Sequence, residues 1–150
     1  MIDGVRCTSV SDRLYERGRL AERTIDWYAQ DTTGTVWYYG EDTAELNRAG
    51  RVTSTEGTWR SGVDGARAGV FMPANPRVGQ SFRQEYYKGQ AEDHFTILRI
   101  SGDRMVTKEW TPLEPGVIDH KIYRRSTGLV NEQTVKGGDE RATLISVRRR

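Results

Sequence analysis

The segment TIDWYAQDTTGTVWYYGED, residues 24–42, decides the fold class of this chain. Its two halves are rich in β-branched and aromatic residues, which favour extended strands. The four residues between them, 31–34, read Asp-Thr-Thr-Gly. Asp and Gly supply the side-chain hydrogen bonds and the positive φ that tight turns require. The segment therefore predicts two antiparallel strands joined by a short loop.

Short alternating segments separated by glycine-containing turns recur along the whole chain, which holds 16 glycines and 4 prolines. No window keeps the 3.6-residue apolar spacing of a helix for long, although a short helical turn near residues 43–47 fits the pattern. The sequence predicts an all-β fold, an antiparallel meander that forms an open or partly closed barrel or a curved sheet. The expected strands are residues 3–10, 12–16, 20–31, 35–42, 51–60, 67–72, 81–88, 91–100, 104–111, 117–124, 128–136 and 140–148.

Length and charge bound the class of protein. A chain of 150 residues is the size of one domain, so we expect a single β domain over 1–150. The net charge of +2, from 23 basic and 21 acidic residues, argues against a strong phosphate footprint, and we predict no nucleic-acid partner. No apolar run approaches the ~18 residues of a membrane span. The N-terminal residues 1–6 lack the basic-then-apolar pattern of a signal peptide.

Metal and cofactor chemistry have few candidate residues. Cys7 is the only cysteine, so no disulfide within the chain can form, and His94 and His120 are the only histidines. Such a set does not suit a structural zinc site. The chain also lacks the serine nucleophile, phosphate-loop and dinucleotide-binding motifs. We therefore predict neither a metal nor a cofactor.

The hairpin can be aligned on its loop. If residues 31–34 join Gln30 to Thr35, opposed residues have numbers that sum to 65, and Tyr28 lies opposite Trp37. A one-residue bulge would exchange the faces, because side chains alternate with period two. In the unbulged register one face carries Thr24, Asp26, Tyr28, Trp37, Tyr39 and Glu41, and the core face carries Ile25, Trp27, Ala29, Val36 and Tyr38.

Aromatic rings beside carboxylates recur in two further segments, Phe82–Lys88 and Lys108–Gly116. Rings stack on the C–H faces of sugars while carboxylates accept hydrogen bonds from hydroxyl groups. The leading hypothesis is a concave aromatic and acidic sheet face that binds a polar small molecule, with carbohydrates the expected class. The expected ligand-binding residues are Tyr28, Trp37, Tyr39, Trp59, Tyr87 and Trp110.

Two alternatives stay open. A glycoside-type hydrolase would use a pair of the same carboxylates, one with a pKa raised by burial, for acid and base catalysis. A structural or partner-binding β domain would use the same residues as cross-strand pairs that only hold a sheet together. The sequence leaves open whether the chain is an enzyme. The carboxylates expected to act in catalysis are Asp26, Glu41, Glu85 and Glu109.

Several sequence segments, taken together, resemble a known family. In order, the chain contains DWYAQD (26–31), VWYYGEDT (36–43), GVDGA (62–66), RQEYY (83–87) and TKEWTPLEPG (107–116). Together they resemble a family of uncharacterised bacterial proteins, many of them secreted proteins or lipoproteins, over nearly the whole chain. The resemblance implies an extracytoplasmic setting but no activity or catalytic residue. Compared with the family, this chain lacks a strand segment before residues 2–5 and has a shorter stretch between residues 91–93 and 107–109. An exposed edge could therefore pair with a second copy.

Overall fold

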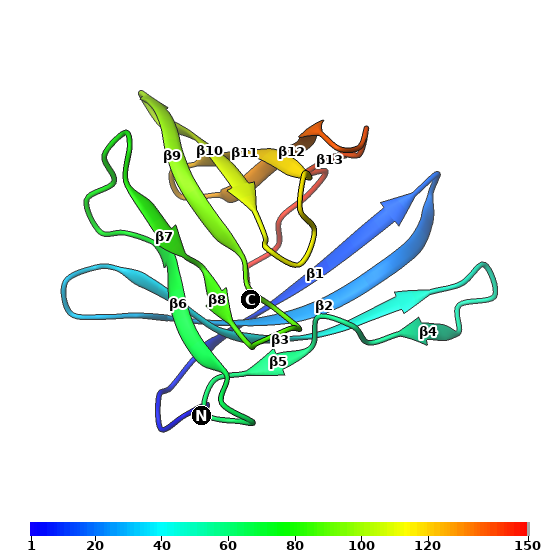
Figure 1. Cartoon of the computed structure of the whole chain (residues 1–150). Coiled ribbons are helices and arrows are strands. Elements are labelled where there is room, and N and C mark those ends of the chain that lie inside the picture. The colour runs from blue at the N-terminus through cyan, green and yellow to red at the C-terminus, as the bar shows by residue number, and fades with distance from the viewer. Residues whose placement is uncertain (150) are drawn as a thin grey trace. The chain divides into compact units, whose positions relative to one another are not determined.

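The computed structural model describes residues 1–149, and this part of the chain forms strands but no helix. The chain divides into two compact units, each built on one antiparallel sheet (Figure 1). Unit 1 comprises Met1–Asn75 and Arg83–Glu92, and unit 2 comprises Pro76–Phe82 and Asp93–Arg150. The predicted all-β, antiparallel fold is confirmed, and each sheet is open at two edges. The single domain expected from the chain length stays a prediction.

The sheet of unit 1 has seven strands, and β3 is its hub. The main order is β1-β2-β3-β6-β8, and β3 also pairs with β5 and β4 further along the edge that it presents to β6. The strands are β1 (Thr8–Glu16), β2 (Arg19–Gln30), β3 (Val36–Leu46), β4 (Val52–Ser54), β5 (Trp59–Arg60), β6 (Arg67–Met72) and β8 (Glu85–Tyr86).

The sheet of unit 2 has six strands in the order β13-β12-β11-β10-β9-β7. Its central strands alternate between buried and more exposed residues, as expected for a sheet with one face on a core. Within residues 1–149, no helix is long and apolar enough to cross a membrane. The strands are β7 (Ser81–Arg83), β9 (His94–Ser101), β10 (Arg104–Trp110), β11 (Ile118–Arg124), β12 (Gly128–Lys136) and β13 (Arg141–Thr143).

Most expected strands are present, with five local differences. The expected strand 81–88 is divided into β7 (Ser81–Arg83) and β8 (Glu85–Tyr86), which belong to different sheets. The helical turn considered near 43–47 is wrong, because β3 continues to Leu46 and the Asn47 side chain then accepts backbone hydrogen bonds that close a turn. The expected strands 3–10 and 12–16 form one strand, β1, which begins only at Thr8. Two short strands, β4 and β5, replace 51–60, and β13 covers only the start of 140–148.

The register between β2 and β3 differs from the unbulged prediction. Next to the turn Ala29 lies opposite Trp37, and Tyr28 lies opposite Tyr38. A bulge follows, so that beyond it Trp27 lies opposite Gly40. The register next to the turn is already one residue away from the prediction, because Gln30 pairs with Val36 and not with Thr35. Such a shift moves side chains to the other face, so Tyr38 joins the face of Tyr28 and Trp37 leaves it. The predicted face assignment for this strand is therefore wrong.

Gly40 makes the bulge possible. Its φ of +136° lies in a region that side chains rarely adopt, and a Cβ at this position would lie 2.3 Å from the backbone oxygen of Trp59. Since β5 pairs with β3 here, the missing side chain allows the two backbones to approach. It also leaves room for Arg60, whose guanidinium lies over the Trp27 ring at 4.6 Å from its centroid.

Asp31 closes the β2–β3 hairpin. Its Oδ1 accepts hydrogen bonds from Thr33 N at 2.8 Å and Thr35 N at 3.1 Å, and its Oδ2 accepts one from the Trp37 indole N–H at 2.8 Å. Hydrogen bonds from the side chains of Thr33 and Trp37 lower the pKa of Asp31 to about 2. The turn is therefore built from an ionised aspartate, as its Asp-Thr-Thr-Gly sequence indicates.

We expect Gly40→Ala to destabilise the protein by more than about 3 kcal/mol, because the new Cβ collides with backbone. Gly50→Ala is the matched control, since Gly50 has a φ of +72° but nothing within 4 Å of its built Cβ. That variant should lose only about 1–2 kcal/mol. Urea unfolding followed by circular dichroism measures both, and equal losses would contradict the proposed close approach.

Asp31→Asn should lower the melting temperature at neutral pH. Folding lowers the pKa of Asp31 in the wild type. The ionised Asp31 therefore stabilises the fold fully above about pH 4, and this stabilisation is lost as the pH falls toward 2. The difference between wild type and variant should therefore shrink over that range in thermal unfolding. Asp139→Asn, in the exposed connection between β12 and β13, serves as the control. A difference for Asp31→Asn that is independent of pH would argue against the turn assignment.

Candidate functional site

Tyr38 is the centre of an aromatic and acidic cluster in unit 1. Its ring stacks on Tyr28 with the centroids 4.9 Å apart, and it meets the Trp59 ring edge-on at 5.5 Å. Its hydroxyl donates a 2.6 Å hydrogen bond to Asp26 Oδ1. Phe71 completes the aromatic packing against the same two tyrosines. The register next to the turn brings Tyr38 to this face, and the bulge at Tyr39 then places Glu41 on the same face.

Trp59 links the cluster to the second segment of unit 1. It is 3% exposed, and its indole N–H donates a 2.6 Å hydrogen bond to Glu85 Oε2. On β3 its direct cross-strand neighbour is Glu41, which in turn lies opposite Asp26 on β2. One rung across three strands thus carries Asp26, Glu41 and Trp59. Five of the predicted site residues (Asp26, Tyr28, Glu41, Trp59 and Glu85) meet in this cluster.

Burial raises the pKa of Asp26, an acid of the cluster. Asp26 is 9% exposed, and this desolvation raises its pKa to about 6, although the hydrogen bond from Tyr38 opposes the shift. The pKa of Tyr38 lies well above its usual value because burial, and then the charge of Glu41, disfavour the phenolate. Near neutral pH the pair therefore consists of a carboxylate that is costly to ionise and a phenol that stays protonated. Such a pair suits a structural support.

Two predicted ligand-binding residues of unit 1 lie outside this cluster. Trp37 lies opposite Ala29 and therefore on the other face of the sheet from Tyr28. Its indole N–H donates a hydrogen bond to Asp31 in the turn. Tyr39 is the extra residue of the bulge, and its backbone oxygen accepts a hydrogen bond from Ser61 N. The structure thus splits the single aromatic face that the unbulged register predicted.

The predicted residues Glu109 and Trp110 belong to unit 2 and have their own surroundings. Glu109 Oε1 accepts hydrogen bonds from Thr107 at 2.8 Å and Tyr123 at 2.9 Å, while Oε2 lies 3.0 Å from Lys121 Nζ. Burial of Lys121 would lower its pKa, but the charge of Glu109 outweighs it and holds that pKa well above the usual value. Trp110, 40% exposed, stacks on the His94 ring. Glu109 is thus engaged in an ion pair and two hydrogen bonds.

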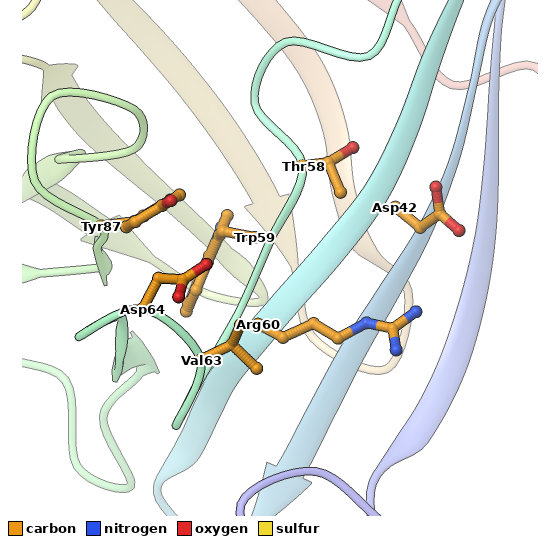
Figure 2. A pocket seen from close by; sticks show the side chains of 7 residues that line it. All are labelled: Asp42, Thr58, Trp59, Arg60, Val63, Asp64 and Tyr87. Carbon is orange, nitrogen blue, oxygen red and sulfur yellow. The ribbon is translucent and has the colours of Figure 1, made fainter.

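An open depression lies beside the aromatic cluster of unit 1 (Figure 2). Its volume is about 280 Å³. Tyr87 and Asp64 lie next to Trp59 on one side, and Arg60 extends toward Asp42 on the other. The lining residues are Asp42, Thr58, Trp59, Arg60, Val63, Asp64 and Tyr87.

The loop that presents Asp64 is firmly anchored. Val63 and Ala66 close it by backbone hydrogen bonds, and the Ser61 hydroxyl donates to Asp3 Oδ2 at 3.0 Å. Asp64 itself has a φ of +49°, a left-handed conformation that Asp tolerates. The depression therefore has a pre-formed rim rather than a loose one.

Sequence reasoning found Trp59 and Tyr87 but missed the charged residues around them. Asp64 sits in the glycine-dense segment 57–69, whose composition marks a loop without showing where it folds back. Asp42 and Arg60 reach the depression only because β5 pairs with β3. In residues 1–149, no group of three or more His, Cys, Asp or Glu side chains is arranged to hold a metal ion.

The raised pKa of Asp26 gives a pH-dependent prediction for Asp26→Asn. Between about pH 4 and pH 7 the unfolded wild type ionises before the folded state does, so wild-type stability falls relative to the variant by about 3 kcal/mol. Urea unfolding at several pH values measures this change. Glu45→Gln, an exposed acid on β3, is the control. A wild-type-to-Asn difference that stays constant with pH would refute the burial of a raised-pKa acid.

Comparison with known proteins finds no match to this chain among protein-family models, curated proteins or solved structures. The family resemblance of the sequence therefore stays a prediction. The geometry and chemistry of the cluster and the depression are the grounds on which a function can be proposed.

Proposed function

We propose that unit 1 binds a polyhydroxylated small molecule, of the carbohydrate class, in the depression lined by Trp59 and Tyr87. The observation that carries the proposal is the gathering of a partly exposed aromatic ring, Tyr87, with two exposed carboxylates, Asp42 and Asp64, around one hollow. An aromatic face stacks on the C–H face of a sugar, and carboxylates accept hydrogen bonds from its hydroxyl groups.

The other lining residues fit the same ligand. Arg60 and Thr58 supply donors for hydroxyl or ring oxygens, so the hollow offers both halves of a hydrogen-bonding set. The volume of about 280 Å³ is just below the range of roughly 300–1,000 Å³ that is usual for ligand sites, and it suits a small ligand. Tyr87 supplies the accessible aromatic face, because Trp59 is almost completely buried.

The buried cluster supports this site from behind. Trp59 is held by the Glu85 carboxylate and by the edge of Tyr38, so the floor of the hollow has little freedom to move. A rigid supporting shell lowers the entropy that a ligand must remove on binding. In this proposal Asp26, Tyr38 and Glu85 act as positioning residues and do not touch the ligand.

Binding is favoured over glycoside hydrolysis by the position of the acids. Neither this hollow nor the depression at Arg99 and Arg104 is lined by any of the four acids predicted for catalysis. Asp26 and Glu85 are buried, and Glu85 holds an indole N–H. A hydrolase needs a carboxylate pair on either side of the scissile bond. Their burial agrees better with a supporting role.

The proposal predicts that at least one member of a panel of mono- and oligosaccharides binds the full chain in isothermal titration calorimetry. Asp64→Asn should weaken binding by about tenfold or more while leaving the fold intact, because Asn also tolerates a positive φ. Tyr87→Ala should weaken it similarly through loss of stacking. Tyr15→Ala, an exposed tyrosine of β1 outside the depression, should bind as wild type does.

Three outcomes would overturn this function. The panel could show no heat of binding, the Asp64 and Tyr87 variants could bind normally, or the Tyr15 control could weaken binding as strongly as they do. A parallel assay with chromogenic aryl glycosides separates the enzymatic alternative. Turnover that is abolished by Glu85→Gln would replace binding with hydrolysis as the function of the unit.

A further inference from the structure

One face of the unit 2 sheet carries cations on its strands and no acid. The cross-strand register defines this face, because directly opposed residues point to the same side. We call it the basic face, defined by Arg99, Arg104, Lys108, His120, Arg124 and Arg141. Its rungs are His94–Trp110, then Thr96–Lys108–His120–Gln133–Arg141, then Arg99–Val106–Ile122–Asn131–Thr143, and finally Ser101–Arg104–Arg124–Gly128.

The acids of the same strands lie on the opposite face. Glu109 is opposed by Asp119, and Lys121 by Glu132, and all four alternate in sequence with residues of the basic face. Lys121 lies 3.0 Å from Glu109 and 3.5 Å from Glu132 there, and Asp119 accepts a hydrogen bond from the Thr134 hydroxyl. Charge is therefore sorted between the two faces of one sheet.

The charge of the whole chain conceals this sorting. Unit 2 contains 12 lysines and arginines against 8 aspartates and glutamates, a net charge of +4, while unit 1 contains 11 against 13, a net charge of −2. The total of +2 led to the prediction of no nucleic-acid partner. A phosphate footprint depends on the local field of one surface, so the total does not decide the question.

The densest part of the basic face surrounds a second depression. It has a volume of about 230 Å³ and is lined by Arg99, Ser101, Arg104 and Val106. Arg104 lies directly opposite Arg124, a repulsive arrangement that an anion between them would relieve. Asp103, which is not on the strands of this face, has its Oδ2 3.9 Å from Arg124 Nε. Both side chains are more than half exposed, so this ion pair is weak.

A second pair of opposed arginines, in unit 1, differs from the Arg104–Arg124 pair in having an acid on its own face. Arg13 and Arg23 face each other on β1 and β2 in unit 1, and both are exposed. Their face also carries the acid Asp42, which lies opposite Ile25 on the next rung. The Arg104–Arg124 pair has no acid on its own face of the ladder.

An aromatic platform lies at the other end of the basic face. The rings of His94 and Trp110 stack with centroids 4.4 Å apart and planes 9° apart. Trp110 is 40% exposed, so part of its indole is open to a third flat ring. Aromatic side chains beside cations on an open sheet are the means by which proteins hold single strands, whose bases stack while their phosphates pair.

We propose that the basic face of unit 2 binds single-stranded nucleic acid. Arg99, Arg104 and Arg124 pair with phosphates, and a base stacks on Trp110. The neutral side chains between the cations, Asn131 and Gln133, offer amide donors and acceptors to bases, whereas a lipid surface would favour exposed apolar groups there. The inference concerns unit 2 alone and is independent of the function proposed for unit 1.

The experiment is fluorescence anisotropy of a labelled deoxythymidine oligomer of about 12 nucleotides with the full chain. Wild type should bind, with log K falling linearly against log salt concentration. The double variant Arg104→Gln/Arg124→Gln should lose about tenfold in affinity at low salt, and its salt slope should be shallower by about 1.4. Trp110→Ala should weaken binding without changing the slope, because stacking releases no counterions.

The matched control is Arg13→Gln/Arg23→Gln, which removes the same charge from an opposed arginine pair in unit 1. It should bind as wild type does. The proposal is overturned if wild type does not bind the oligomer, or if the control loses as much affinity as the test variant. It is also overturned if a sulfated polysaccharide or vesicles with anionic lipid bind more tightly than the oligomer. Circular dichroism of each variant confirms that the fold is retained.

Discussion

The bulge between β2 and β3 is the constraint on which unit 1 depends. Because Gly40 has a positive φ and no side chain, β5 can pair with β3 at that point and bring Trp59 beside Glu41. The one-residue shift also places Glu41, three residues after Tyr38 on β3, on the face where Tyr38 contacts Tyr28 and Asp26. Without the bulge Tyr38 and Glu41 would lie on opposite faces of the sheet. The bulge thus joins the Tyr28–Tyr38 pair to the rung of Asp26, Glu41 and Trp59.

The acids of the cluster are buried, whereas the acids that line the neighbouring depression are exposed. The acids predicted for catalysis in unit 1 are used to hold rings in place, as Glu85 does for the Trp59 indole. The accessible carboxylates are Asp42 and Asp64, which lie on exposed parts of the chain. A binding site of this kind separates a rigid support from an adaptable polar rim.

The hairpins could be predicted from the sequence because their turns have local causes. Asp31 and Asn47 each bind backbone amides within a few residues, and such contacts are encoded by the turn residues themselves. The bulge could not be predicted in the same way, since it depends on the approach of β5, which is distant in sequence. Gly40 in a strand was its one visible signal. The acids were found as residue types, but their burial follows from contacts that periodicity does not show.

The basic face of unit 2 could be predicted from the sequence only in part. Arg104, Val106, Lys108 and Trp110 alternate with buried residues in a pattern that is visible in the sequence. Their partners on β9, β11 and β12 became known only with the register, because three irregularities shift the pairing. Net charge averages over both faces and both units, so it gave no sign of a surface with one sign of charge.

The central claim is that the bulged register places Tyr38 between Tyr28 and Trp59, and proton NMR tests it most directly. The ring centroids lie 4.9 Å and 5.5 Å apart, so nuclear Overhauser effects should join the ring protons of Tyr38 to those of both neighbours. Cross-peaks between the Tyr28 and Trp37 rings, with none from Tyr38 to Tyr28 or Trp59, would show the unbulged register and contradict this account of the site.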